Sequence, residues 1–424
     1  MTVVPGPGPD CLAARSRAAL CVLGREYLLI GHLQDRVGLP LAIREVGEAA
    51  QTQLAIDEWM GASPIYSRRM QRLLRFEGRD VATVFKNLQL DIGAPHQFMD
   101  FQFRLDRPDY GEFWLPHCGA LLDVERFGEG RVRTMCHDIE DPTFDATAAA
   151  TDPRLRMRPI HRPPRVPPDR YPHCRWKVYL DEEAAPYGQH PHLRLLEKSR
   201  IAATPVELPD RDREPGGWRD YSGPFDPGFQ LEDLSHRALV AVCQEIPVQS
   251  HLLARSLLLA VRTRHGEAVA RSIGRGQWTG AAAIGAWRLR RALGLGEGIE
   301  DVVEVFRLHP HFLPRTYVDL VAEVTGERRA TIGLRDCPAL EEADADSWFG
   351  GLSEAGHPAL DAIATVVSPR ARLRPVRRPD ARFAWEIEID PGAEPRPEPP
   401  EMRLGRVSRG VDFELMPRRP LRVD

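Results

Sequence analysis

The residues best suited to chemistry in this chain are concentrated between positions 112 and 145. That span holds two cysteines, two histidines and three neighbouring carboxylates: His117, Cys118, Cys136, His137, Asp138, Glu140 and Asp141. A thiol beside an imidazole can act as a nucleophile that a base activates, and thiolate and imidazole are also ligands that zinc prefers. The span therefore predicts either nucleophilic catalysis or metal binding.

In the catalytic interpretation, Cys118 is the nucleophile and His137 the general base, and Asp138 or Glu140 orients the imidazole. The sequence predicts a short strand that runs into Cys118 and a short helix that follows it. Free backbone N–H groups at such a helix start would lower the pKa of the thiol. The alternative is that Cys118 is a buried packing residue, as free cysteines usually are.

In the metal-binding interpretation, Cys118, Cys136 and His137 are ligands of a divalent metal such as zinc, with Glu140 or His117 completing the set. The spacing does not match a standard zinc signature, because the chain has no Cys-x-x-Cys pair. The metal hypothesis therefore rests on the residue types more than on their spacing.

Other ligand-binding candidates lie outside this span. His173 and Cys174 are on a predicted strand that we expect to approach His117 and Cys118. His32 is a further candidate, although a histidine in a buried helix more often has a structural hydrogen-bonding role. Two His-x-His pairs are expected to be surface features: His190 with His192, and His309 with His311.

The second half of the chain repeats the first at an offset of 219 residues, as Trp59 and Trp278 illustrate. The same offset pairs further residues in one order: Glu26 with Glu245, His32 with His251, Arg36 with Arg255, and Cys118 with Cys337. So many matches in one order predict a tandem duplication. In the second copy Asp336 replaces His117, and the Cys136-His137 pair has no counterpart, so we expect the working site in the first copy.

Each copy is predicted to be a helical segment followed by a small antiparallel sheet, which is the α+β class. In the first copy, strands are expected at 96–105, 113–116, 154–160 and 174–180, where apolar and polar residues alternate or short apolar runs occur. Two such copies are expected to pack as an internal pseudo-dimer. The predicted units are the first repeat at 12–186, a Pro/Gly-rich linker at 187–230, a degenerate second repeat at 231–395 and an extended C-terminal arm at 396–424.

Composition excludes several classes of function. A formal net charge of −4 gives no electrostatic reason to expect nucleic acid or an anionic membrane as partner. Seven cysteines, an odd number spread thinly, argue against a disulfide framework. The first residues do not have the pattern of a signal peptide, so the cytoplasm is the expected location. A small molecule is the expected partner, and further pairing into a homo-oligomer stays open.

The order of these segments resembles the L-2-amino-thiazoline-4-carboxylic acid hydrolase family, and the four-vinyl-reductase-like small-molecule-binding domains are similar in outline. The resemblance is sharpest at Cys118 with Cys136 and at the sequence DCPAL, which begins at Asp336. It implies a hydrolase that opens a cyclic C–N bond in a small sulfur heterocycle. This chain departs from the family by being doubled, and by having His117 and Gly119 where the second copy has Asp336 and Pro338.

The sequence therefore predicts a small-molecule hydrolase that uses the Cys/His cluster of the first copy. The alternative is a non-catalytic protein that binds a metal or a small ligand, as a sensor or carrier. A third reading is a purely structural interaction protein, which predicts no pocket beside Cys118.

Overall fold

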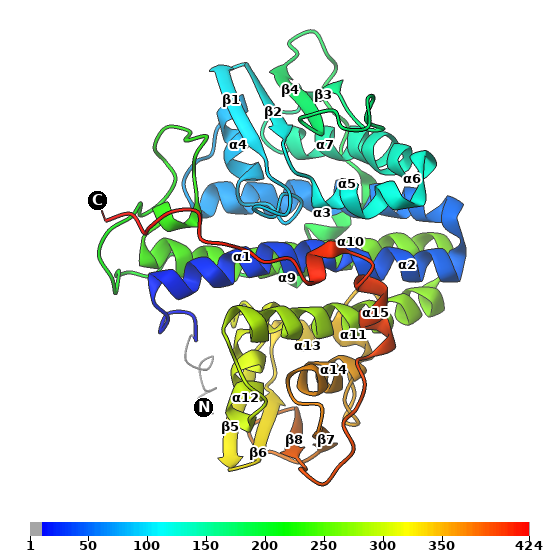
Figure 1. The fold of residues 1–424 in the computed structure, drawn as a ribbon, viewed down its shortest axis with the longest axis vertical. Helices are drawn as coiled ribbons and strands as arrows, with labels where there is room; N and C mark the ends of the chain where they lie inside the picture. Colours follow the sequence, from blue (N-terminus) through cyan, green and yellow to red (C-terminus); the bar gives the residue numbers. More distant parts are fainter. Residues whose placement is uncertain (1–10, 424) are drawn as a thin grey trace.

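The computed structural model describes residues 11–423 and has long helices across its middle and a small sheet at each end (Figure 1). The central helices are α1 (Arg17–Leu33), α2 (Asp35–Val46), α3 (Glu48–Leu73), α10 (His236–His265) and α11 (Glu267–Ala292). Their apolar residues recur at helical spacing and are buried against one another, so the core of the molecule lies where the two halves of the chain meet.

The sheet of the first half consists of β1 (Gln102–Arg107), β2 (Tyr110–Leu115), β3 (Leu155–His161) and β4 (Cys174–Leu180). Neighbouring strands of this sheet are antiparallel, and their order is β1-β2-β4-β3. Phe113 of β2 faces Trp176 of β4, and their rings stack in the space between the sheet and the helices.

The sheet of the second half has the same strand order, β5-β6-β8-β7. Its strands are β5 (Leu320–Gly326), β6 (Arg329–Leu334), β7 (Ala371–Pro375) and β8 (Phe383–Ile389). Two helix-rich halves with small antiparallel sheets confirm the predicted α+β class. The matching strand order is consistent with the predicted duplication, which itself stays a prediction.

Shorter helices connect and cover these elements. In the first half they are α4 (Val81–Leu88), α5 (Gly119–Val124), α6 (Glu129–Arg133), a π-helix (Thr134–Ile139) and α7 (Glu140–Ala149). In the second half they are α12 (Ile299–Leu308), α13 (Pro338–Glu341) and α14 (Pro358–Val367). Among the described residues, no helix combines the length and the apolar character needed to cross a bilayer.

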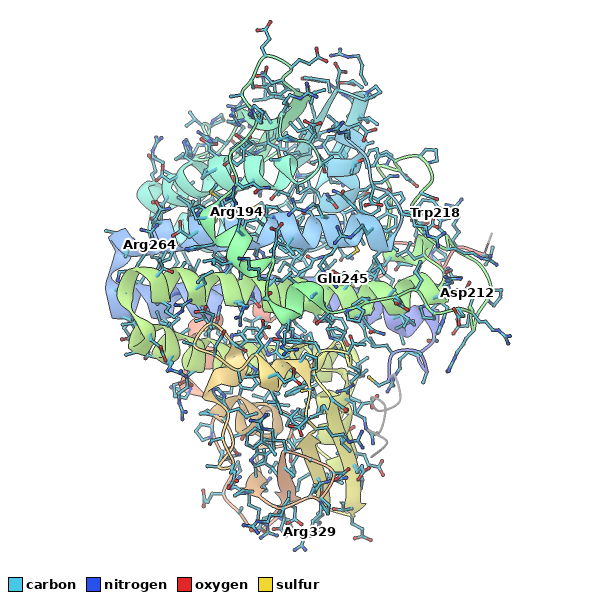
Figure 2. All side chains as sticks on the ribbon, turned by 180° about the vertical axis from the view of Figure 1, so that it is seen from behind. Arg194, Asp212, Trp218, Glu245, Arg264 and Arg329 are labelled. Atoms are coloured by element: carbon cyan, nitrogen blue, oxygen red, sulfur yellow. The ribbon has the colours of Figure 1, made fainter. Side chains whose placement is uncertain are left out.

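Two buried ion pairs connect the halves in a reciprocal way. Glu26 of α1 accepts a hydrogen bond of 2.6 Å from Nε of Arg288 in α11, and Glu245 of α10 accepts one of 2.6 Å from Nε of Arg69 in α3. The two carboxylates and the two guanidinium groups are each 219 positions apart. Figure 2 shows Glu245 at the centre of the molecule. Such reciprocity is what an approximate two-fold interface produces.

The segments that follow each half cross to the opposite half. The linker carries α8 (Pro191–Leu196) and α9 (Arg200–Ala203), and the C-terminal arm carries α15 (Pro400–Gly405). Glu342 of the second half accepts a hydrogen bond from the backbone N–H of Arg200, and Asp123 of the first half accepts one from that of Arg409. The arm is therefore not extended throughout, because its carbonyl groups and α15 pack against the core.

Breaking one reciprocal pair should be costly. In Glu26→Ala the guanidinium of Arg288 stays buried without its carboxylate, and we expect the free energy of unfolding to fall by about 3–5 kcal/mol. Urea denaturation measures this change. The exposed pair of Arg271 and Glu267 is the control, since Glu267→Ala should cost less than about 1 kcal/mol. Equal costs for the two variants would contradict the importance assigned to the buried pair.

Candidate functional site

The structure brings together five of the residues singled out in the sequence. Cys118, Cys136, Glu140, His173 and Cys174 line one small cavity between the sheet of the first half, α5 and α7. Cys118 lies between β2 and α5, as the sequence predicts, and Cys174 opens β4. The cavity has a volume of about 10 Å³, which is about enough for one water molecule. It has no room for an organic substrate.

Burial raises the pKa of the thiols that line this cavity. The Cys118 sulfur accepts a hydrogen bond of 3.4 Å from the backbone N–H of Leu121 at the start of α5. Loss of solvent outweighs that bond and raises the pKa of Cys118 to about 12, and burial also raises the pKa of Cys136 and of Cys174. The expected lowering of the Cys118 pKa is therefore wrong. Burial likewise raises the pKa of Glu140 to about 8, so this carboxyl is mostly protonated at neutral pH.

The proposed base and its orienting group lie elsewhere. His137 Nε2 is 2.7 Å from the carbonyl oxygen of Pro163, and His137 does not line the cavity. Asp138 is exposed. His117 is half-buried and its ring stacks on that of Phe413. The centroids of the His117 and His173 rings are 6.3 Å apart. The structure therefore does not place His137 or Asp138, the predicted base and orienting group, in the cavity beside Cys118.

His32 is buried and hydrogen-bonded, which fits the structural role given above as the alternative to ligand binding. Its ring is buried edge-on against Phe98, and its Nε2 lies 3.1 Å from Nη2 of Arg36. Burial lowers the pKa of His32 well below its usual value, so the imidazole is neutral and accepts the hydrogen bond from the guanidinium.

The predicted metal ligands Cys118, Cys136 and His137 do not form a site with the geometry of a metal centre. Within residues 11–423, three ligand atoms come within 4.8 Å of one another only in the group Asp57, His190 and His192. The expectation that the two His-x-His pairs are surface features is also wrong, because His192, His309 and His311 are buried.

Hydrogen bonds already satisfy the carboxylate of this second group. Arg264 donates to one oxygen of Asp57 at 2.7 Å, and Gln53 donates to the other at 2.7 Å. Nδ1 of His190 accepts from the backbone N–H of His192, so its proton is on Nε2, which faces Asp57 at 3.3 Å. Although burial alone would raise the pKa of Asp57, the bonds from His190, Gln53 and Arg264 lower it to about 2. The group therefore attaches α8 to α3 and is not a vacant cation site.

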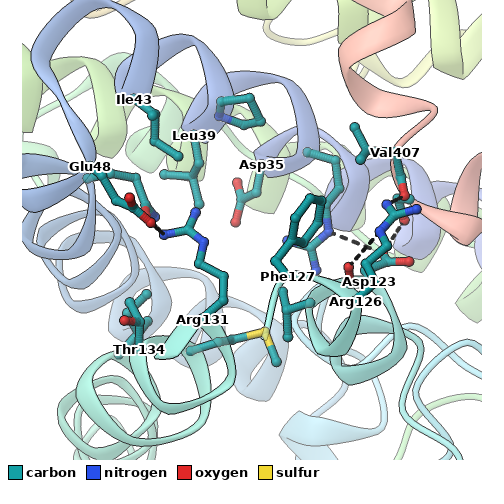
Figure 3. A pocket seen from close by; sticks show the side chains of 17 residues that line it. Asp35, Leu39, Ile43, Glu48, Asp123, Arg126, Phe127, Arg131, Thr134 and Val407 are labelled. Carbon is teal, nitrogen blue, oxygen red and sulfur yellow. Dashed lines mark hydrogen bonds and ion pairs between the residues drawn. The ribbon is translucent and has the colours of Figure 1, made fainter. Parts of the chain in front are cut away.

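A much larger cavity lies on the other side of the π-helix. It has a volume of about 450 Å³ and lies between α2, the α5–α6 segment, the π-helix and the C-terminal arm. Figure 3 shows Asp35 at its centre, pointing between Arg131 and Phe127. The apolar residues of its wall are Leu39, Pro40, Ile43, Val124, Phe127, Met135, Ile139 and Val407. We call this cavity the Asp35 pocket.

The Asp35 carboxyl group in the pocket wall has a second buried carboxyl group beside it. Asp35, the first residue of α2, is 4% exposed, and Glu58 of α3 is fully buried beside it. Trp59 Nε1 donates to one oxygen of Asp35 at 3.1 Å, and the side chains of Asp35 and Glu58 are hydrogen-bonded to each other. Burial raises the pKa of Asp35 to about 6, and burial together with Asp35 raises that of Glu58 well above its usual value. Of the two carboxyl groups, Glu58 therefore keeps its proton to the higher pH.

The corresponding place in the second half has lost both the acids and the space. The positions 219 residues after Asp35 and Glu58 are Ala254 and Gln277. Trp348 lies there and donates from Nε1 to Gln277 at 3.1 Å, and the cavity beside Ala254 has a volume of only about 10 Å³. The acidic pair and the open pocket therefore occur together in the first half.

The π-helix separates the two cavities of the first half. Met135 and Ile139 line the Asp35 pocket, whereas Cys136, between them in sequence, lines the small cavity. Single π-helical turns inside helices occur frequently at functional sites.

Sequence reasoning missed Asp35 and Glu58 because they do not cluster with other reactive residues along the chain. The offset of 219 residues could have pointed to them. Asp35 is next to Arg36 and Glu58 is next to Trp59, which have identical residues at that offset, whereas the positions of Asp35 and Glu58 hold neutral residues there. Comparisons with family models, curated proteins and solved structures found no match. The resemblance to the thiazoline hydrolase family therefore stays a prediction.

Thiol labelling tests the description of the small cavity. In native protein at pH 8, we expect iodoacetamide to alkylate Cys118 at least about 100-fold more slowly than in the unfolded chain, because only a minute fraction is thiolate. Mass spectrometry of tryptic peptides follows each cysteine, and Cys11, which is partly exposed, is the internal control. Rapid alkylation of native Cys118 would restore it as a candidate nucleophile.

Proposed function

We propose that this protein binds a small molecule in the Asp35 pocket. The observation that carries the proposal is a cavity of about 450 Å³ with a largely apolar wall, to which Asp35 adds a carboxyl group. Burial raises the pKa of that carboxyl group to about 6, and groups with shifted pKa values are concentrated at functional sites. The volume and the largely apolar wall are typical of small-molecule sites.

The proposal includes the predicted tandem duplication, with the binding site in the first copy. The reciprocal pairs of Glu26 with Arg288 and of Glu245 with Arg69 support it. The second copy then has the role of completing the helical core, and Trp348 fills the place that the ligand takes in the first copy. A cytoplasmic location and further pairing into a homo-oligomer stay predictions.

The carboxyl pair supports a second candidate function, the hydrolase predicted from the sequence, with different residues. A base with a pKa of about 6 is suited to proton transfer near neutral pH. In this version Asp35 takes a proton from a water molecule while the water oxygen forms a bond to the carbon of a C–N bond. The C–N bond then breaks, and Asp35 gives the proton to the leaving nitrogen. Cys118 takes no part, because its thiol is buried on the other side of the π-helix.

Filling the pocket should abolish binding. We expect the neutral probe 1-hexanol to bind, and Leu39→Trp to remove the binding because the indole occupies the apolar part of the cavity. Saturation-transfer NMR detects the bound alcohol. Leu195→Trp, at an exposed leucine of α8, is the matched control and should bind like the wild type. If 1-hexanol bound neither the wild type nor the control, or bound Leu39→Trp equally well, the pocket would not be the site.

The cost of the buried acid should appear as a pH dependence of stability. Since burial raises the pKa of Asp35 from 3.8 to about 6, the native state holds a proton that the unfolded chain releases between these values, and stability falls as pH rises through this window. Asp35→Asn removes that loss. We expect the variant to be more stable than the wild type by about 3 kcal/mol at pH 7, with a difference that shrinks towards pH 4.

Urea denaturation of both proteins at pH 4, 5.5 and 7 provides the measurement. An Asp35→Asn variant that is less stable than the wild type at pH 7 would show that the carboxylate is a structural group.

A further inference from the structure

We infer that the ligand of the Asp35 pocket is an uncharged molecule with an extended hydrocarbon chain, which lies along α2 between Asp35 and Ile43. This inference rests on the proposed function and names the chemical class of its ligand. It follows from the arrangement of the apolar side chains in the wall, from the length of the cavity and from the balance of the charges around it.

Six of the eight apolar residues in the wall come in pairs that are three or four residues apart in sequence. Residues at this spacing lie on one face of a helix, so each pair presents an apolar strip to the cavity. The pairs are Leu39 with Ile43 on α2, Met135 with Ile139 on the π-helix, and Val124 with Phe127 on α5 and the 3₁₀ turn that follows it. A hydrocarbon chain gains free energy by leaving water for such a wall, whereas a polar group would lose its hydration there.

The row of residues along α2 indicates the length of the cavity. Asp35, Leu39 and Ile43 follow one another at intervals of four residues, and Figure 3 shows all three beside the cavity. The distance from Asp35 to Ile43 along the helix axis is about 12 Å, since each residue adds about 1.5 Å. An extended hydrocarbon chain of that length has about ten carbon atoms.

The charged side chains of the wall balance one another. The cavity is lined by three acidic residues and three arginines: Asp35, Glu48 and Asp123, and Arg36, Arg126 and Arg131. Charges of opposite sign lie close together, because Arg131 donates to Glu48 at 3.2 Å and Nε of Arg36 is 3.6 Å from a carboxylate oxygen of Asp123. A charged ligand of either sign would lose its hydration and meet charges of both signs, so the wall favours a ligand without charge.

The second half of the chain provides an internal comparison. At the place that corresponds to the pocket, beside Ala254 and Gln277, the structure has the buried indole of Trp348. That side chain is uncharged and consists mostly of hydrocarbon. The helical scaffold that the two halves have in common therefore accommodates an uncharged, largely apolar group at this place.

A series of linear alcohols tests the inference: 1-hexanol, 1-octanol, 1-decanol and 1-dodecanol, measured with the full-length protein at pH 7 by calorimetry. We expect the affinity to rise about fourfold with each methylene group, which corresponds to about 0.8 kcal/mol, as far as 1-decanol. The step to 1-dodecanol should add less than about twofold, because the chain is then longer than the cavity. Decylamine and decanoate, which are charged at pH 7, should bind at least about tenfold more weakly than 1-decanol.

Two neighbouring substitutions on α2 place the chain in the cavity. Ile43→Trp fills the end of the row, so the affinity should stop rising at about 1-octanol while the affinity for 1-hexanol stays within about twofold of the wild type. Retained binding of 1-hexanol also shows that this variant has folded. Arg44→Trp is the matched control, because Arg44 is exposed and does not line the cavity, and it should keep the dependence on chain length seen in the wild type.

The outcomes separate this inference from the proposal on which it rests. If decylamine or decanoate binds as tightly as 1-decanol, or if the affinity does not change with chain length, the ligand is not an uncharged chain, and the pocket remains a binding site. The inference is also overturned if the affinity keeps rising at the same rate to 1-dodecanol, or if Ile43→Trp and Arg44→Trp give the same dependence on chain length. If none of the alcohols binds, the proposed function itself is overturned.

Discussion

The architecture depends on charges that are buried where the two halves meet. Glu26 with Arg288 and Glu245 with Arg69 are the same interaction made twice, in opposite directions across the interface. Each guanidinium also donates to a backbone carbonyl oxygen of the segment that follows its own half, Arg288 to that of Gly410 and Arg69 to that of Ala202. A displaced half would therefore leave charges and carbonyl groups without partners, which gives the interface a defined register.

Loss of solvent raises the pKa of thiols and of carboxyl groups in the first half, with opposite consequences for the two. It raises the pKa of Cys118 to about 12, far above neutral pH, so this thiol stays protonated. It raises the pKa of Asp35 only to about 6, just below neutral pH, so this group can both hold and release a proton. Loss of solvent thus disfavours proton loss from Cys118, the nucleophile that the sequence predicts, and brings the pKa of Asp35, which the sequence does not single out, close to neutral pH.

The fold could be predicted further than the site, for physical reasons. The spacing of apolar residues predicts strands and helices, because that pattern is local in the chain. The offset between Trp59 and Trp278 predicts that the elements of the two halves correspond. The small cavity was partly foreseeable, since Cys118 follows β2 and Cys174 opens β4, and adjacent strands bring them together. The raised pKa of Cys118 could not be predicted from the sequence, because burial depends on packing between elements that are distant in the chain. Asp35 and Glu58 meet only because α2 and α3 pack side by side, and no spacing along the chain reveals which helical faces touch.

The C-terminal arm adds an order of events to this arrangement. Val407 and Ser408 line the Asp35 pocket, although they lie far along the chain from the helices that form the rest of its wall, and Asp123 holds them there. During synthesis on the ribosome, the first half emerges long before these residues do. The pocket therefore stays without one wall until residues 407 and 408 have been synthesised, and a chain that stops before them has an open groove in place of the cavity.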